Sequence, residues 1–175
     1  MHIIIDGYNL IRQSDVLRRY ERSSLEAGRL ALVRRIAAYQ KARPHRLTVV
    51  FDGREGDSPT EQRDVLEGVL VVYSRRGERA DDLIKGMVEK SGDEVLVVTS
   101  DRGIADFVAR RGGAAIPSPE FEAILMSVPQ SPQKTDRQAR AEGKDNGQRE
   151  SLKKKGPSHR LSKREKATQK RLRKL

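Results

Sequence analysis

The chain has no cysteine among its 175 residues, and its three histidines, His2, His45 and His159, are far apart in the sequence. The absence of cysteine excludes disulfide bonds, thiolate zinc sites and a cysteine nucleophile, and it is compatible with a reducing compartment. No apolar run approaches the roughly 20 residues that span a bilayer, and the first apolar stretch is too short for a signal-peptide core. We therefore expect a soluble cytoplasmic protein with no membrane partner.

Several phosphate-handling motifs are also missing. The sequence contains neither G-x-x-x-x-G-K followed by Ser or Thr nor G-x-G-x-x-G, so neither a P-loop nor a dinucleotide fold is supported. A phosphatase of the haloacid dehalogenase type would carry a second aspartate two positions after Asp6, where this chain has Tyr8. The sequence therefore does not support a P-loop protein, a dinucleotide-binding protein or a phosphatase of the haloacid dehalogenase type.

Charge is distributed unevenly along the chain. The sequence holds 36 basic and 25 acidic residues, and residues 131–175 contain 16 of the basic and 5 of the acidic ones, which accounts for the whole net charge of +11. This C-terminal segment has no Phe, Tyr or Trp and few aliphatic residues, so it cannot bury enough apolar surface to offset its ordering entropy. We predict one domain at 1–128 and a basic, disordered tail at 129–175.

Apolar runs without polar alternation occur at 2–5, 47–51, 69–73 and 95–99, with a shorter run at 114–116. Such runs are typical of strands buried on both faces of a parallel sheet. Segments with helical spacing lie between them, and a last helix is expected from Pro119 to Met126. The pattern predicts an α/β fold with an open, mostly parallel sheet flanked by helices.

Two local features refine this prediction. Ser23 and Glu26 are spaced as a capping box before the apolar stripe of the first long helix, whereas no helix signal directly follows Asp6. The segment 54–64 is polar and contains Gly and Pro, so we expect a surface loop there, with at most one helical turn.

Acidic residues gather at the ends of the predicted strands and at the starts of the helices that follow: Asp6, Asp52, Glu78, Asp81, Asp82 and Asp101. The carboxyl ends of parallel strands meet at one edge of a sheet, which is where ligands bind in open α/β folds. We therefore expect at least four acids to converge on one edge.

Clustered carboxylates repel one another unless a cation is present. An oxygen-only cluster without cysteine suits Mg²⁺ or Mn²⁺, ions that promote phosphodiester hydrolysis. Each acid taken singly also has a structural interpretation: a turn residue at Asp52, a helix cap at Asp101 or at Ser100 before it, and favourable helix-dipole partners at Asp81 and Asp82. Asp82 and Asp106 are the acids expected most readily to be solvated surface residues.

Four stretches, IIIDGYNLI, VVFDG, GERADDLI and VVTSDRGI, together resemble the YacP-like branch of the NYN domains, relatives of PIN-type nucleases. The resemblance covers roughly residues 1–125 and implies a metal-dependent endoribonuclease with a PIN-like fold. Bacterial members of this branch are associated with cutting mRNA on translating ribosomes. The family motifs do not explain the basic tail.

Matching positions imply roles for individual residues. The resemblance implies that Asp6, Asp81 and Asp101 are the catalytic, metal-binding core. Asp52 fits the expected edge as a further metal ligand or as a group that orients one. Supporting roles are expected for Asn9, Glu78 and Asp82, and Asn9 has three interpretations: a metal ligand, a group that positions phosphate, or a turn or cap residue.

Basic residues lie both beside the acids and in the tail. Arg54, Arg79 and Arg102 are expected to guide an RNA backbone, while the tail, including Lys153, Lys154 and Lys155, attracts phosphates without reading sequence. The alternatives are ordinary surface charge for the arginines and a solubilising role for the tail.

The sequence thus predicts a Mg²⁺- or Mn²⁺-dependent endoribonuclease that hydrolyses phosphodiester bonds of ribosome-associated mRNA or other structured RNA. The main alternative is a non-catalytic RNA- or ribosome-binding protein with a PIN-like fold. A third interpretation is a DNA-directed nuclease of the same type.

Overall fold

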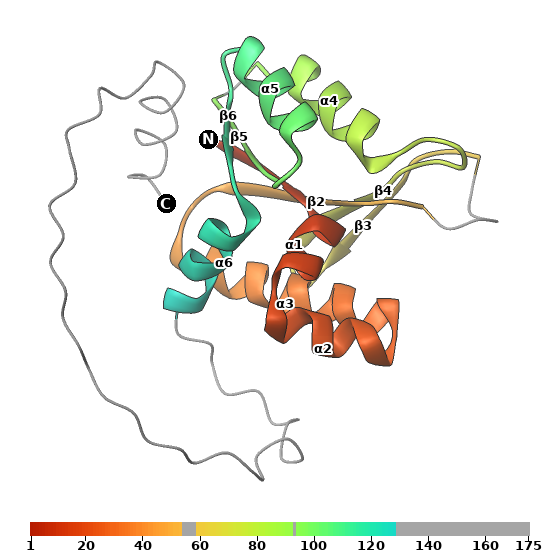
Figure 1. The fold of residues 1–175 in the computed structure, drawn as a ribbon, viewed down its shortest axis with the longest axis vertical. Helices are drawn as coiled ribbons and strands as arrows, with labels where there is room; N and C mark the ends of the chain where they lie inside the picture. The colour runs from red at the N-terminus through yellow and green to blue at the C-terminus, as the bar shows by residue number, and fades with distance from the viewer. Residues whose placement is uncertain (54–58, 93, 129–175) are drawn as a thin grey trace, which may run out of the picture.

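A six-stranded sheet runs through the centre of the molecule in the order β3-β4-β2-β1-β5-β6 (Figure 1). The computed structural model describes residues 1–53, 59–92 and 94–128. Every neighbouring pair of strands is parallel except β3 with β4. The strands are β1 His2–Asp6, β2 Arg46–Phe51, β3 Gln62–Leu66, β4 Val69–Tyr73, β5 Val95–Val98 and β6 Ala114–Ile116. This architecture confirms the predicted α/β fold with an open, mostly parallel sheet.

Helices cover both faces of this sheet (Figure 1). They are α1 Gly7–Gln13, α2 Asp15–Ser23, α3 Leu25–Ala42, α4 Ala80–Lys90, α5 Arg102–Arg110 and α6 Ser118–Ser127. Alternate residues of β1 enter two separate cores: Ile3 and Ile5 pack with residues of α1, α3 and α6, whereas Ile4 packs with residues of α4 and α5. Because both faces are covered, the central strands are mostly apolar on both sides.

The register of the central strands aligns their carboxyl ends. Ile5 of β1 lies opposite Val49 of β2 and Val98 of β5, and Asp6 lies opposite Val50. The chain segments that leave β1, β2 and β5 therefore start at the same edge of the sheet.

The first two helices were not expected, and the inference that no helix follows Asp6 was wrong. Asp6 is itself the N-cap of α1, with its Oδ1 accepting a hydrogen bond from the Asn9 amide at 3.2 Å. The first long helix is capped by Ser24, because Ser23 still belongs to α2. The polar helix α2 buries only Leu17, so its sequence shows no apolar stripe.

The segment predicted as a surface loop contains part of a strand. Gln62–Leu66 forms β3, while residues 54–58 lie outside the described residues. β3 is an edge strand that is mostly exposed and pairs only with β4. Glu67 and Gly68, with φ values of 52° and 83°, form the tight turn that reverses the chain. Backbone pairing rather than apolar burial stabilises this strand, so its sequence is polar.

The boundary proposed at residue 128 stays a prediction, because residues 129–175 lie outside the described part of the chain. Among the described residues, no helix has both the length and the apolar character needed to cross a bilayer.

Candidate active site

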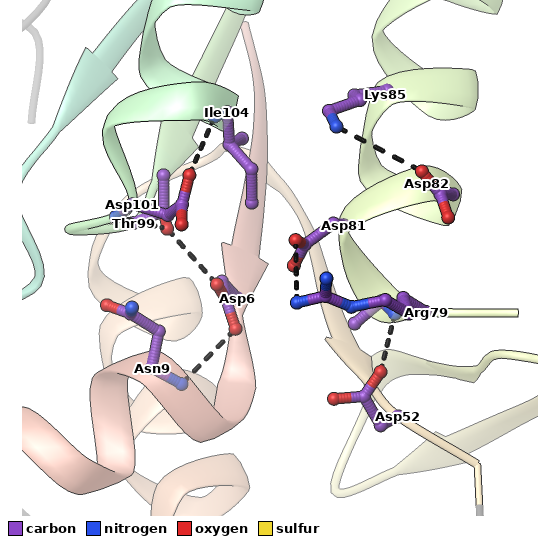
Figure 2. Close-up of polar contacts among 11 residues, drawn as sticks. Asp6, Asn9, Asp52, Arg79, Asp81, Asp82, Lys85, Thr99, Asp101 and Ile104 are labelled. Carbon is purple, nitrogen blue, oxygen red and sulfur yellow. Dashed lines mark hydrogen bonds and ion pairs between the residues drawn. The ribbon is translucent and has the colours of Figure 1, made fainter.

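Four of the predicted site acids lie around the carboxyl end of β1. Asp6 is the last residue of β1, Asp52 follows β2, Asp81 is in the first turn of α4, and Asp101 is the N-cap of α5. Figure 2 shows Asp6 between Asp101 and Asp81, with Asp52 on the side of Asp81. The parallel topology thus brings together acids that are distant in the sequence.

Asp6 is the most buried of these acids, with 8% of its surface exposed. The pKa of Asp6 is raised to about 6, chiefly by burial and in addition by the negative charges of Asp81 and Asp52, although hydrogen bonds from the Asn9 amide and the Thr99 hydroxyl lower it. Among the described residues no basic side chain forms an ion pair with Asp6. Its environment is therefore one that a bound cation would stabilise.

Asp81 has a basic partner. Arg79 Nη2 lies 3.1 Å from Asp81 Oδ2, and the side chain of Arg79 is 77% exposed. Glu78 pairs with Arg75 at 3.3 Å. Asp82 points away from Asp6 in Figure 2 and contacts Lys85 at 4.0 Å. Of the three acids near the start of α4, Asp81 therefore faces the shared edge and Asp82 does not.

Asp52 connects β2 to α4. Its Oδ1 accepts a hydrogen bond from the Ala80 amide at 2.6 Å, and Arg79, the N-cap residue of α4, makes no side-chain capping bond. Asp52 therefore supplies from a neighbouring strand the cap that α4 lacks. This bond holds the turn that carries Asp81.

Thr99 links Asp101 to Asp6. The Thr99 hydroxyl donates to Asp6 Oδ2 at 3.1 Å and accepts from the Asp101 amide at 3.1 Å. Asp101 Oδ1 in turn accepts from the Ile104 amide at 3.0 Å as the cap of α5 (Figure 2). Thr99 had no predicted role, although its place directly after a buried strand and two residues before Asp101 indicates a position at the sheet edge.

Asn9 holds three elements together. Its Oδ1 accepts hydrogen bonds from the Ser100 amide at 2.9 Å and from the Ser118 hydroxyl at 2.7 Å. The Ser118 amide also donates to the Ser100 hydroxyl at 3.2 Å. The side-chain Oδ1 of Asn9 is thus already bonded to protein groups, which favours a positioning role for Asn9 over metal ligation. Ser100 was expected only as an alternative helix cap to Asp101, and Ser118 had no predicted role.

The basic residues predicted to guide RNA are only partly described. Arg79 and Arg102 are exposed beside Asp81 and Asp101, whereas Arg54, Lys153, Lys154 and Lys155 lie outside the described residues. An open depression precedes α4 and is lined by Pro59, Arg75, Arg76, Gly77 and Glu78.

The acids at this edge offer carboxylate oxygens, which are the type of ligand that a hard divalent cation binds. Carboxylate oxygens are the ligands that Mg²⁺ and Mn²⁺ prefer, and the pKa of Asp6 is raised chiefly by burial and further by the nearby charges of Asp81 and Asp52. Within the described ranges, however, no three His, Asp or Glu side chains stand close enough together to hold a metal ion in their present arrangement. A cation shared by Asp6 and Asp81 would compete with Arg79, which pairs with one oxygen of the Asp81 carboxylate.

Comparison with known proteins identifies a matching family and a similar protein. The family model described as the YacP-like NYN domain matches residues 3–174, which extends beyond residue 125, where the sequence resemblance was expected to end. The uncharacterized protein YacP of Bacillus subtilis (strain 168) is 28% identical over 102 residues, which is 57% of this chain and 59% of that protein. The match therefore spans less than two thirds of the relative.

Two crystal structures of Rae1 (YacP) from Bacillus subtilis are similar in fold, each at 23% identity over 73% of this chain. The TM-score is 0.62 for one, with 75% of that chain covered, and 0.61 for the other, a mutant of the same protein, with 76% covered. YacP-like NYN domains are PIN-like nuclease domains, which indicates an RNA-related function. Because the family model matches almost the entire sequence, the chain belongs to the YacP-like NYN domain family.

Proposed function

We propose that this protein is a divalent-metal-dependent endoribonuclease that hydrolyses RNA phosphodiester bonds. The observation that carries the proposal is Asp6, a buried carboxylate with a raised pKa that shares the sheet edge with Asp52 and Asp81 in a PIN-like nuclease fold. Buried acids without a basic partner are costly to folding, so their presence at a ligand-binding edge favours a functional role.

Asp6 and Asp81 would hold a Mg²⁺ or Mn²⁺ ion, and Asp52 and Asp101 are available as further ligands. When bound, such an ion supplies Lewis-acid activation of water and neutralises charge on the phosphate. Thr99 orients the Asp6 carboxylate and Asp52 orients the first turn of α4. Arg79 balances the charge of Asp81 when no cation is bound. When a cation is bound to Asp81, Arg79 would be able to bind a phosphate of the RNA.

The proposed substrate is ribosome-associated mRNA or other structured RNA. The 16 basic side chains of residues 131–175, Lys153, Lys154 and Lys155 among them, supply a sequence-independent attraction for phosphates. Arg79 and Arg102 stand beside the acids that would cleave the backbone, where phosphate contacts would set its path.

The first prediction concerns Asp81→Asn. We expect this change to lower cleavage of labelled RNA by at least about a hundredfold while leaving the fold and RNA binding intact, because it removes a ligand charge without removing volume. The measurement is cleavage of free RNA and of mRNA on translating ribosomes with Mg²⁺, Mn²⁺ or EDTA.

Glu89→Gln is the matched control, since Glu89 lies at the other end of the same helix, where it pairs with Arg111. The parent and this control should cut RNA only with a divalent ion. Cleavage by Asp81→Asn at the parental rate would mean that the site is assigned wrongly. Tight RNA or ribosome binding by the parent without cleavage under any condition would instead favour the non-catalytic RNA-binding protein.

A further inference from the structure

Three aromatic rings meet beside the acidic edge, on the face of the sheet that α1 and α3 cover. The ring of Phe51 lies 5.1 Å from that of Tyr8 and 5.9 Å from that of Tyr73. A Cβ atom at Gly7 would lie 2.3 Å from the Phe51 ring, so only glycine fits at the first residue of α1, directly after β1. Tyr8 and Phe51 are close in sequence to Asp6 and Asp52, and the ring cluster is thereby fixed to the ends of the strands that carry these acids.

Arg29 of α3 lies over this cluster. Its guanidinium carbon is 5.3 Å from the centroid of Tyr8, 5.4 Å from that of Phe51 and 5.1 Å from that of Tyr73. Its Nε donates to the Tyr8 hydroxyl at 2.8 Å, and its Nη2 donates to the same oxygen. Cation–π contacts and these two hydrogen bonds hold the guanidinium in a defined orientation.

Among the described residues, no carboxylate lies within ion-pair distance of the Arg29 guanidinium. The side chain is half-buried, so part of the hydration of its guanidinium is lost. Two of its five N–H donors bind the neutral Tyr8 hydroxyl, and within the described part of the chain the other three have no hydrogen-bond acceptor. A fixed, partly desolvated guanidinium with free donors is well suited to bind an anion.

A second guanidinium contacts the same ring. The Arg12 guanidinium carbon lies 5.4 Å from the Tyr8 centroid, and its side chain is 67% exposed. Its acidic partner, Glu21, is 3.9 Å away, at the limit of an ion pair. The guanidinium carbons of Arg12 and Arg29 lie 5.4 Å and 5.3 Å from the same ring centroid, so both positive charges favour an anion beside Tyr8.

We propose that Arg29 and Arg12, held on Tyr8, form a phosphate-binding subsite for a backbone phosphodiester of the RNA near the scissile bond. The subsite would position the strand where it passes from the acids onto the face of α1 and α3. Arg29 would bind the phosphate with a guanidinium group that Tyr8 holds in a fixed orientation. Arg12, which is exposed, would bind the same phosphate from the surface. This inference rests on the proposed ribonuclease function.

The test is binding of a fluorescein-labelled oligouridylate to the full-length protein in EDTA, measured by fluorescence anisotropy at several salt concentrations. Arg12→Gln and Arg29→Met should each weaken binding about tenfold. Each should also reduce the slope of log affinity against log salt concentration by about 0.7, the value for one lost single-strand phosphate contact. Arg29→Lys should keep most of the slope but bind less tightly, since lysine retains the charge and loses the fork.

Arg22→Gln is the control, because it removes an exposed positive charge from α2 without touching the ring cluster. Arg29→Met removes packing as well as charge, whereas the exposed Arg12 can be replaced without disturbing the fold. Parental affinity and salt slope in Arg12→Gln and Arg29→Lys would overturn the subsite. If the parent cuts RNA while these variants bind it normally, the subsite alone is wrong; a parent that never cuts RNA refutes the proposed function itself.

Discussion

The Asp6 carboxylate combines burial, two hydrogen bonds and two nearby negative charges. Its pKa of about 6 lies above the ordinary value of 3.8, so the folded protein favours the protonated form. The stabilisation that the protonated group contributes is fully present below the unfolded pKa of 3.8 and is lost as the pH rises through about 6. At neutral pH, without a divalent cation, the ionised Asp6 therefore opposes folding.

The corresponding prediction is that Asp6→Asn abolishes cleavage but stabilises the metal-free protein. An amide of the same shape can still accept from the Asn9 amide and can donate to Thr99, without the buried charge. We expect the free energy of unfolding at pH 7 in EDTA to rise by roughly 1–3 kcal/mol. The gain over the parent should vanish below pH 4 and develop between the two pKa values.

Urea unfolding across this pH range measures the effect. A gain independent of pH would show that Asp6 is not the group that titrates. Addition of Mn²⁺ gives a further readout that does not depend on activity, since the ion should raise the melting temperature of the parent more than that of Asp6→Asn.

Three helices begin at the acidic edge, and an acid accepts a backbone hydrogen bond at the start of each. Asp6 caps α1, Asp101 caps α5, and Asp52 reaches from the end of β2 to the Ala80 amide in α4. The partial positive charge of a helix N-terminus stabilises a carboxylate placed there. The structural and functional interpretations of these acids are therefore compatible, because capping a helix engages only one oxygen of each carboxylate.

At the element scale we predict that Asp52→Ala lowers the free energy of unfolding by about 1 kcal/mol, whereas Asp52→Asn keeps most of it. Asparagine retains an acceptor for the Ala80 amide and alanine does not. The measurement is urea unfolding, with amide hydrogen exchange at the first turn of α4. Equal stability of the alanine variant and the parent would contradict the role of Asp52 in holding this turn.

The whole chain divides its charge into two unlike parts, with 20 basic and 20 acidic residues in 1–130 and an excess of 11 positive charges in 131–175. We predict that deletion of 131–175 weakens binding to RNA and ribosomes and flattens its salt dependence, because the phosphate contacts of the tail are lost. The melting temperature should stay within a few degrees of the parental value. A large fall in melting temperature would mean that the segment packs on the domain.

The sequence by itself determined the central strands and the positions of the acids. Continuous apolar runs predict strands buried on both faces, and the carboxyl ends of such parallel strands must share an edge, which is where Asp6, Asp52 and Asp101 lie. These features depend on local composition and on the geometry of a parallel sheet.

Only the tertiary structure decided the remaining features, because they depend on contacts between residues distant in the sequence. The polar strand β3 exists through its pairing with β4, and α2 through its packing on α3. The bond from Asp52 to Ala80 and the placement of Arg29 on three rings join elements that no local pattern connects. A residue's type and spacing show what chemistry it can perform, whereas the packing of its neighbours decides which partner it meets.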